Sequence, residues 1–485
     1  MRWCTESIEA HLTRKATVFR IMIFEPREIR ELAEDAFPEQ GSRMAQEVTK
    51  RVLVLHYHEI WLKGGNKKFF LSRLIAAVKR SLEDLSSQPL EHVADRLLVA
   101  VPDESLLPAM VERLQKVFGL AYIGMAWEVS GGMPEIARCA CRMMEQKAPR
   151  SFAVRAKIAD SASGFRSMEV ERELGREILT SLQAKGSDVR VRLKDPEVTC
   201  WVEVVPGKTF VYAERAEGAG GLPAATGGRL VMLLSGGFDS GVAAYKMMRR
   251  SAHLIFVHFY GGTSISGSSS KPVADRIVRA LTPYQYSSRL YLIPFDSVQR
   301  QIVAGAPESL RVLLYRRMMA RIGREICLAE RALGLVTGDS VSQVASQTLH
   351  NLAAVDHGID LPIYRPLAGD DKEEILRLAR RIGTYEISCE PFEDCCPRFM
   401  PRSPAIFSNP EELDTAEKQL DIENLVTMGI EGSQVLDFKY EMGQIAVREG
   451  LPRRFEKFLE YRKALRAEIP NPPAPVVNPQ QLPGS

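Results

Sequence analysis

The stretch VMLLSGGFDSG at residues 231–241 joins a short apolar run to a turn that contains two glycines. A continuous apolar run over 231–234 is typical of a strand that is buried on both faces. Gly236 and Gly237 permit a tight turn and let a ligand approach the backbone closely. Apolar residues then recur at helical spacing over 242–248. The stretch therefore predicts a strand, a turn and a helix in succession.

The turn has the composition of an anion-binding site. Backbone N–H groups at the start of a helix bind anions, and the helix dipole strengthens that binding. The hydroxyl groups of Ser235 and Ser240 add donors. Asp239 is unusual here, because phosphate repels a carboxylate unless a cation or a hydrogen-bond donor lies between them. Taken alone, the motif fits a surface turn followed by a helix-capping aspartate equally well.

A second segment, PGKT at residues 206–209, contains the GKT of a Walker phosphate loop. Val occupies position 202, where that loop has its first glycine. The segment also lies between TCWVEVV and FVYAE, two runs in which apolar and polar residues alternate. We therefore predict a hairpin turn here and reject the Walker interpretation.

Composition limits the classes of protein that this chain can belong to. A length of 485 residues is enough for about three domains. The chain is 45% hydrophobic and 26% charged, as globular proteins are, and its net charge of +3 means that binding a polyanion requires local clustering of basic residues. No apolar run approaches the roughly 18 residues of a membrane span, and no signal-peptide core is present. A cytoplasmic protein without membrane association is expected.

Cysteine usage points away from a disulfide scaffold and a structural metal. Eight cysteines in 485 residues are too few for a disulfide scaffold, and no CxxC pair exists. No metal site is therefore predicted from the side chains. The adjacent pair Cys395 and Cys396 is the unusual feature, because acidic residues and prolines around it indicate an exposed loop with thiols available for exchange.

The first half of the chain predicts two small α+β modules. Residues 1–50 lack periodicity and are interpreted as an extension. The order of strands and helices over 51–110 suggests a ferredoxin-like module, and 111–215 form a second module rich in basic residues. A solvated charged surface is the simplest interpretation of those residues, but basic side chains on several elements also suit an RNA phosphate backbone. The RNA-binding candidates are Lys67, Lys68, Arg155, Lys157 and Arg166.

The second half predicts a doubly wound α/β domain. Residues 216–228 are glycine-rich and are interpreted as a linker, after which strands and helices alternate over 229–408. Three predicted strands end in polar or glycine residues: 235–237, 258–259 and 337–339. Because ligands bind at the carboxyl edge of a parallel sheet, this coincidence favours a nucleotide site. For 409–485 we expect a helical segment and a disordered, proline-rich tail.

Several motifs together resemble one known family. SGGFDS resembles the PP-loop of ATP pyrophosphatases, which alone leaves asparagine synthetases, GMP synthetases and several tRNA-modifying enzymes open. RRMMARIG, VTGDSVSQVASQTLHNL, RPLAGDDKEEI and PFEDCC, at 316–323, 336–352, 365–375 and 391–396, are similar to the tRNA 4-thiouridine synthetases, the ThiI-type tRNA sulfurtransferases. Upstream, YHEIWLKGGNKKFF resembles the ferredoxin-like module of that family, and RLKDPEVTCWVEV resembles its THUMP RNA-binding domain. The resemblance covers about 51–408.

The resemblance implies an activity. Such enzymes use ATP to adenylate O4 of the uridine at position eight of tRNA and then transfer persulfide sulfur, which a cysteine desulfurase supplies. ATP, Mg²⁺ and tRNA are the implied ligands, and a role in thiamine thiazole synthesis and a homodimer are further expectations. No cysteine follows Cys396, so the rhodanese chemistry of longer members is not expected. Two rival hypotheses are a non-thiolating tRNA-binding protein and an amide-forming PP-loop synthetase.

The resemblance also implies site residues. Asp239 would orient the phosphates through Mg²⁺, and Cys396 would carry the sulfur with Cys395 or Cys389 as its resolving thiol. The side chains of Leu233, Leu234 and Phe259 are expected in the core, so that only their backbone would touch adenine. Arg316 stands where some members have Lys. The full set of implied ATP contacts is Leu233, Leu234, Ser235, Gly236, Gly237, Ser240, His258, Phe259, Arg316, Gly338 and Gln347.

Overall fold

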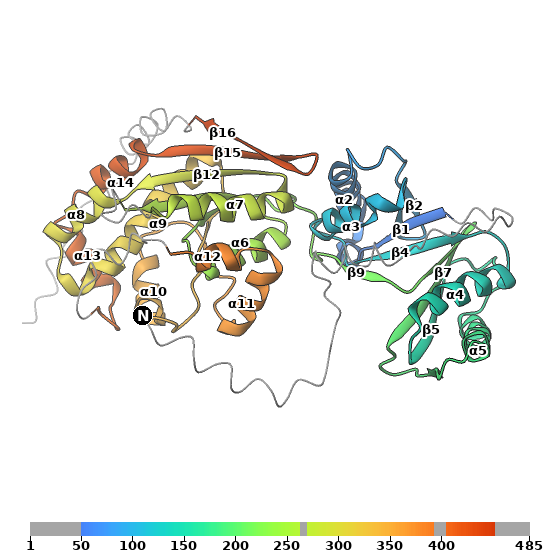
Figure 1. Cartoon of the computed structure of the whole chain (residues 1–485). Helices are drawn as coiled ribbons and strands as arrows, with labels where there is room; N and C mark the ends of the chain where they lie inside the picture. The colour runs from blue at the N-terminus through green and yellow to red at the C-terminus, as the bar shows by residue number, and fades with distance from the viewer. Residues whose placement is uncertain (1–49, 262–268, 392–403, 452–485) are drawn as a thin grey trace, which may run out of the picture. The chain divides into compact units, whose positions relative to one another are not determined.

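The computed structural model describes residues 50–261, 269–391 and 404–451, which divide into two compact units between Pro223 and Ala224. Each unit is built on one sheet and is described by itself (Figure 1). None of the helices in the described ranges has the length and apolar character that crossing a membrane requires.

The first unit contains a nine-stranded sheet of order β2-β3-β1-β4-β8-β7-β5-β6, with β9 also paired to β4. Its strands are β1 (Lys50–His56), β2 (Glu91–Val93), β3 (Arg96–Ala100), β4 (Tyr122–Val129), β5 (Ser151–Ile158), β6 (Arg190–Val191), β7 (Val198–Val205), β8 (Lys208–Tyr212) and β9 (Arg215–Glu217). Its helical segments are η1 (Glu59–Asn66), α2 (Lys67–Ser81), η2 (Glu104–Leu106), α3 (Leu107–Gln115), α4 (Met133–Lys147) and α5 (Ser167–Ala184).

The two predicted α+β modules share this sheet, because β4 pairs with β1 of the first module and β8 of the second. The boundary predicted at 110 falls inside α3, where Met110, Val111 and Leu114 are buried in the core of the first module. Alternate residues of β1, such as Leu53 and Leu55, pack in that core because side chains alternate across a strand. The hairpin predicted at 206–209 is confirmed: β7 and β8 pair antiparallel across it.

The predicted linker is structured over its first half. Strand β9 pairs with β4, and Ala219 and Leu222 beyond it are buried. A Cβ atom at Gly218 would lie 2.2 Å from the carbonyl oxygen of Leu120, so only glycine allows this contact. The glycines that suggested a linker therefore also permit close packing, which the sequence pattern alone did not distinguish.

The second unit contains a seven-stranded sheet of order β14-β13-β10-β11-β12-β15-β16. Its strands are β10 (Arg229–Leu233), β11 (His253–Tyr260), β12 (Ser287–Pro294), β13 (Leu335–Val336), β14 (Ile363–Tyr364), β15 (Gln434–Glu441) and β16 (Gln444–Gly450). Its helical segments are α6 (Phe238–Arg249), α7 (Lys271–Gln285), α8 (Asp296–Gly305), η3 (Glu308–Leu310), α9 (Arg311–Glu330), η4 (Ala345–Gln347), α10 (Leu349–Asp356), α11 (Lys372–Arg381), α12 (Tyr385–Cys389), α13 (Pro410–Glu417) and α14 (Ile422–Glu431).

The predicted doubly wound parallel sheet is confirmed for β10 to β14, whose neighbouring strands are parallel. Val231, Ile255 and Ile293 form the sheet face that packs in one core cluster with residues of α8, α9, α13 and α14. Helices α6 and α7 cover the opposite face (Figure 1). Strand β10 therefore has both faces buried, as its apolar run predicted.

The prediction for 409–485 was incomplete. Helices α13 and α14 are present, but the antiparallel hairpin of β15 and β16 follows them and extends the sheet beyond β12. The signal was the alternation of apolar residues on both sides of Met442 and Gly443, which both have the positive φ of a tight hairpin turn. The predicted extension over 1–50 lies outside the described residues except for Lys50, which begins β1, and the predicted proline-rich tail at 470–485 lies outside them entirely.

Candidate functional site

The SGGFDS turn connects β10 to α6, and its own serines hold it. The Ser240 hydroxyl donates to the carbonyl oxygen of Ser235 at 2.9 Å and accepts a hydrogen bond from the Ser235 hydroxyl at 3.1 Å. The backbone N–H of Gly237 donates to the Ser235 hydroxyl at 3.3 Å. Ser240 is only 2% exposed, so it stabilises the turn from inside. The first N–H groups of α6 have no partner within the helix, which makes this end suitable for an anion.

Gly338 lies directly against the start of α6. Strand β13 is parallel to β10, so residues 337–339 leave the sheet beside the SGGFDS turn. A Cβ atom at Gly338 would lie 2.8 Å from the backbone nitrogen of Ser240 and 2.9 Å from its Cα. Any larger residue would push the turn away, so the predicted site residue Gly338 acts here through close packing.

His258 supports the turn from the neighbouring strand. Its ring is 1% exposed, and its two nitrogens lie 2.9 Å from the carbonyl oxygen of Leu234 and 2.8 Å from the Ser270 hydroxyl. Phe259 packs against the Phe295 ring in the core. Leu233 also contacts that core cluster, and Leu234 is 3% exposed. The core location predicted for the side chains of Leu234 and Phe259 is confirmed, and Leu233 is partly buried against the same core.

Asp239 forms an ion pair with Lys372, whose Nζ lies 2.7 Å from Asp239 Oδ1. Lys372 is the first residue of α11, directly after Asp371, which caps that helix. The pair provides the cation that the carboxylate of Asp239 requires beside a phosphate site. Sequence reasoning did not single out Lys372, although it lies within the motif RPLAGDDKEEI that carried the resemblance.

Asp339 is the centre of a buried polar cluster. Its Oδ1 accepts hydrogen bonds from Arg316 and, at 3.1 Å, from Gln347 Nε2. Its Oδ2 accepts from the Thr337 hydroxyl at 2.8 Å and from Arg365 Nε at 3.3 Å. Burial raises the pKa of Asp339, but the charge of Arg316 and these hydrogen bonds outweigh it and hold the pKa below its ordinary value. The structure thus brings two of the predicted ATP contacts together on a carboxylate that is ionised at neutral pH.

The cysteine pair Cys395 and Cys396 lies outside the described residues. The chain that leads to it is anchored beside the SGGFDS turn, because the Tyr385 ring stacks on the Phe238 ring at 5.1 Å and Glu390 pairs with Arg276.

The described cysteines differ in their accessibility. Cys389, at the end of α12, is exposed. Burial raises the pKa of the Cys139 thiol to about 11 and that of Cys327 to about 12. Burial also raises the pKa of Cys141 and of the fully buried Cys200. A smaller fraction of these four thiols is therefore ionised at neutral pH than in an ordinary cysteine.

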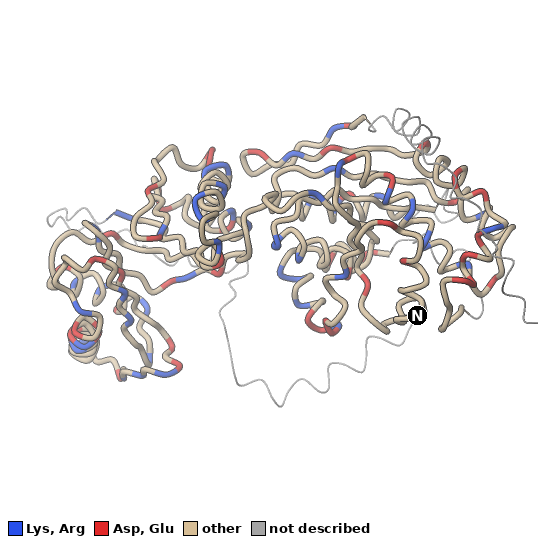
Figure 2. The backbone as a smooth tube through the Cα atoms, turned by 180° about the vertical axis from the view of Figure 1, so that it is seen from behind, with Lys and Arg blue, Asp and Glu red and all other residues tan. Residues whose placement is uncertain are grey.

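The RNA-binding candidates of the first unit have different surroundings. Arg155 and Lys157 lie on the same face of β5 and donate to the Leu193 carbonyl at 2.6 Å and the Tyr122 hydroxyl at 2.8 Å. Lys67 pairs with Asp95 and lies 3.3 Å from the centre of the Trp61 ring. Lys68 is exposed, as is Arg166, whose side chain is 82% exposed. Figure 2 shows the backbone positions of lysine and arginine in blue and of aspartate and glutamate in red.

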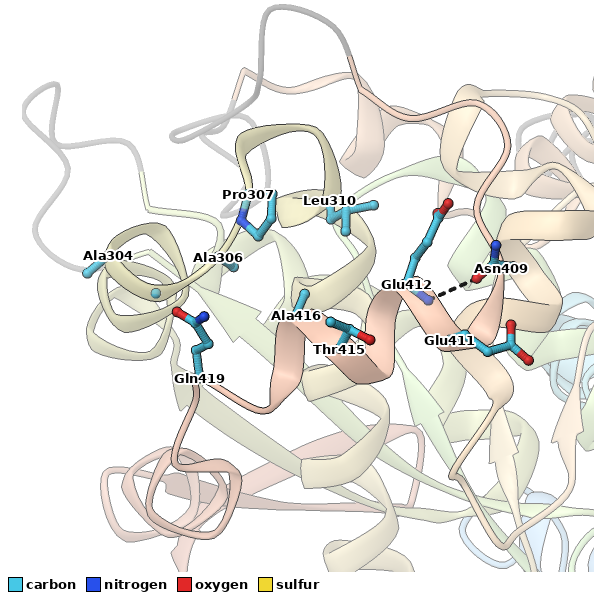
Figure 3. Close-up of a pocket in the computed structure, with 11 residues that line it drawn as sticks. Ala304, Ala306, Pro307, Leu310, Asn409, Glu411, Glu412, Thr415, Ala416 and Gln419 are labelled. Carbon is cyan, nitrogen blue, oxygen red and sulfur yellow. Dashed lines mark hydrogen bonds between the residues drawn. The ribbon is translucent and has the colours of Figure 1, made fainter.

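A separate pocket of about 750 Å³ lies between the end of α8 and α13 (Figure 3). Its described lining includes Glu411 and Glu412 but no lysine or arginine, and Asn409 caps α13 by accepting from the Glu412 nitrogen at 2.8 Å. Two carboxylates without a basic residue would repel phosphates. The pocket is therefore a poor ATP site. Among the described residues, no cluster of His, Cys, Asp and Glu could hold a metal ion.

A glycine-containing turn at the carboxyl end of a parallel strand, with a lysine–aspartate pair and a buried carboxylate bound by two arginines beside it, has the arrangement of the PP-loop ATP pyrophosphatases. Family models match the chain in three regions: the ThiI ferredoxin-like domain over 52–124, the THUMP domain over 132–214, and "Thiamine biosynthesis protein (ThiI)" over 225–422. The chain belongs to the ThiI family of tRNA sulfurtransferases.

Two relatives illustrate this membership. A probable tRNA sulfurtransferase of Thermus thermophilus is 40% identical over 392 residues, which are 80% of this chain and 94% of that protein. A probable tRNA sulfurtransferase of Caldanaerobacter subterraneus is 37% identical over 377 residues, covering 78% and 97% of the two chains.

Two solved structures are also similar. The crystal structure of a 4-thiouridine synthetase–RNA complex with bound ATP superposes with a TM-score of 0.68 at 32% identity, covering 80% of this chain and 99% of that one. PH1313 from Pyrococcus horikoshii shares the fold, with a TM-score of 0.52 at 23% identity and coverage of 69% and 99%.

Proposed function

We propose that this chain is an ATP-dependent tRNA sulfurtransferase that converts the uridine at position eight of tRNA to 4-thiouridine. The observation that carries the proposal is the PP-loop site, with Asp239 paired to Lys372, in the same chain as a THUMP domain. The similar solved complex contains both RNA and ATP, which supports the same two ligands here.

In the first step, uridine O4 would attack the α-phosphate of ATP, and pyrophosphate would leave. The backbone N–H groups at the start of α6 would bind the departing pyrophosphate, and Lys372 would neutralise its charge. Asp239 would orient the phosphates by holding Lys372 in place. One carboxylate suits an ion that keeps most of its ligands from water and phosphate, so Asp239 fits Mg²⁺ bound with ATP, where the ion would neutralise phosphate charge.

In the second step, the terminal sulfur of a Cys396 persulfide would attack C4 and displace AMP. The thiolate of Cys395 or Cys389 would then attack the Cys396 sulfur, form a disulfide with it, and release the thiocarbonyl of 4-thiouridine. The exposed position of Cys389 supports its candidacy. A cysteine desulfurase is the proposed sulfur donor.

The first unit is proposed to bind tRNA through Lys67, Lys68, Arg155, Lys157 and Arg166. Lys68 and Arg166 are exposed, with Arg166 3.8 Å from the exposed Glu169, whereas the other three hold hydrogen bonds within the unit. The description of the matched family model also names thiamine biosynthesis, so sulfur supply for thiamine thiazole is a secondary proposal. A cytoplasmic location, where tRNA is available, and a homodimer remain predictions.

The test is mass spectrometry of tRNA nucleosides from a strain that lacks the protein. We expect 4-thiouridine to disappear and to return when the wild-type chain is supplied. Cys396→Ser should fail to restore it while still adenylating tRNA, with release of pyrophosphate in vitro. Normal 4-thiouridine in the deletion strain would contradict the proposed function.

A further inference from the structure

Asp339 has no role in the proposed chemistry, yet it holds two of the residues that are proposed to contact ATP. We infer that Asp339 is a positioning residue that orients Arg316 and Gln347 so that they recognise the adenine base of ATP. The inference rests on the proposed function for the identity of the nucleotide. It concerns how the site distinguishes one base from another.

The carboxylate fixes which end of the Gln347 amide faces the site. An ionised carboxylate only accepts hydrogen bonds, so the amide must present Nε2 to Asp339, at 3.1 Å. The amide oxygen Oε1 is consequently turned away from Asp339. The same Oδ1 atom binds Arg316, so both side chains are oriented from one point.

These two side chains each retain one unsatisfied polar atom. Gln347 Oε1 and Arg316 Nε are buried and have no hydrogen-bond partner among the described residues. Leaving a polar atom in this state costs about 1–3 kcal/mol, which native structures rarely accept without a reason. Together they offer one acceptor and one donor at the sheet edge where the SGGFDS turn begins.

An acceptor beside a donor complements the hydrogen-bonding edge of adenine but not that of guanine. Adenine carries an N6 amino donor next to a ring-nitrogen acceptor, whereas guanine carries the acceptor O6 in place of the amino group. The oxygen of Gln347 would accept from N6, and Arg316 would donate to the ring nitrogen. Guanine would instead place O6 against the Gln347 oxygen, and neither atom has a proton to share.

The rest of the cluster keeps Asp339 itself in place. Thr337 and Arg365 bind its second oxygen, and Asp356 holds Arg365 in turn at 2.6 and 2.8 Å. Asp356 contacts neither Arg316 nor Gln347 in the described structure. It therefore provides a matched control, a carboxylate of the same cluster that is not expected to influence base recognition.

The experiment measures tRNA-dependent pyrophosphate release by the full chain with ATP and with GTP. We expect Asp339→Asn to reduce the ATP-to-GTP ratio of kcat/KM by at least about tenfold, mainly through a higher KM for ATP. Asp356→Asn should leave the ratio unchanged, and Asp339→Glu should restore part of it. Because Asp339 is buried, Gln347→Leu provides a second variant at a half-buried position at the end of η4, with the same expected loss.

Two outcomes would overturn the inference. The first is an unchanged ATP-to-GTP ratio in folded Asp339→Asn and Gln347→Leu. The second is altered discrimination between uridine and cytidine in the RNA with an unchanged nucleotide ratio, because the pair would then face the target base. Failure of the proposed function is distinguishable, since it would appear as absent 4-thiouridine formation by the wild-type chain while the nucleotide ratio still depends on Asp339.

Discussion

Glu203 in the first unit and Asp339 in the second are both buried carboxylates among basic and hydroxyl groups, but their partners differ in kind. Glu203, 0% exposed, binds Arg96 of β3, His56 of β1 and Tyr212 of β8, all of them within one sheet. Asp339 binds residues of α9 and η4 at the carboxyl edge of a parallel sheet. A buried carboxylate therefore joins two modules in the first unit, and in the second it holds two residues that are proposed to contact ATP.

Replacing Glu203 is expected to have the largest effect, and on stability alone. Glu203→Gln would leave Arg96 buried without its counter-charge, which typically costs about 3–5 kcal/mol. All four tryptophans precede residue 224, so tryptophan fluorescence in urea reports on the first unit. We expect its unfolding midpoint to fall while the ATP-to-GTP ratio stays unchanged. A changed nucleotide ratio in this variant would remove the distinction between the two carboxylates.

The second largest effect is expected at the SGGFDS turn and on activity alone. Asp239→Ala should reduce 4-thiouridine formation by about 10²–10³-fold. The variant lacks the carboxylate that holds Lys372 in place to neutralise the charge of the leaving pyrophosphate. Tryptophan fluorescence and tRNA affinity should stay close to those of the wild type. Lys246→Ala is the control, because Lys246 lies on α6, as Asp239 does, and pairs with Asp370. If Lys246→Ala reduced activity equally, Asp239 would have only a structural role.

A smaller effect is expected for RNA binding by the first unit. Charge reversal at Arg166 should weaken tRNA binding and reduce the slope of log K against log salt by about one. Lys157→Glu should also weaken it, with an added loss of the Tyr122 contact. Arg300→Glu, at an exposed arginine of the second unit, is the control for net charge. A tRNA affinity that does not change between about 50 and 200 mM salt would exclude the phosphate-backbone interface.

The sequence predicted the parts of the molecule that depend on neighbours in the chain. The apolar run before SGGFDS, the hairpin at 206–209 and the parallel sheet follow from periodicity and turn residues. The pairing of Lys372 with Asp239, 133 positions earlier, depends on how α11 packs and has no local signal. Likewise, Arg316 and Gln347 were identified by resemblance, but their common partner Asp339 became visible only in the fold. The hairpin of β15 and β16 did have a local signal, in the alternation around Met442 and Gly443, and was missed.

The smallest effect is expected when the pH is lowered from 7.5 to 5.5, and it concerns the stability of the first unit. Burial lowers the pKa of His56 below 6.5, so His56 is neutral in the folded chain and gains a proton more readily when unfolded. Stability of the first unit should therefore be constant above pH 6.5 and decrease below it, by at most about 1.4 kcal/mol per pH unit.

Protonation of Glu203 decreases the stability of the first unit further, but only at lower pH. Burial raises its pKa, but the hydrogen bond to His56 and the charge of Arg96 lower it further, to about 2 against an ordinary 4.5. Its contribution is therefore complete above pH 4.5 and decreases as pH falls from there toward 2. The cluster around Asp339 also holds a carboxyl pKa below its ordinary value, so the ATP-to-GTP ratio should not change between pH 7.5 and 5.5.

Urea unfolding followed by tryptophan fluorescence at several pH values measures the stability of the first unit. His56→Gln is the control, because its side chain cannot titrate. The wild type should lose stability between pH 6.5 and 5.5, and His56→Gln should not. An equal loss in both would assign the pH dependence to other groups. A nucleotide ratio that followed the stability of the first unit over this range would show that the two carboxylates are coupled, and the contrast between a structural and an orienting carboxylate would then fail.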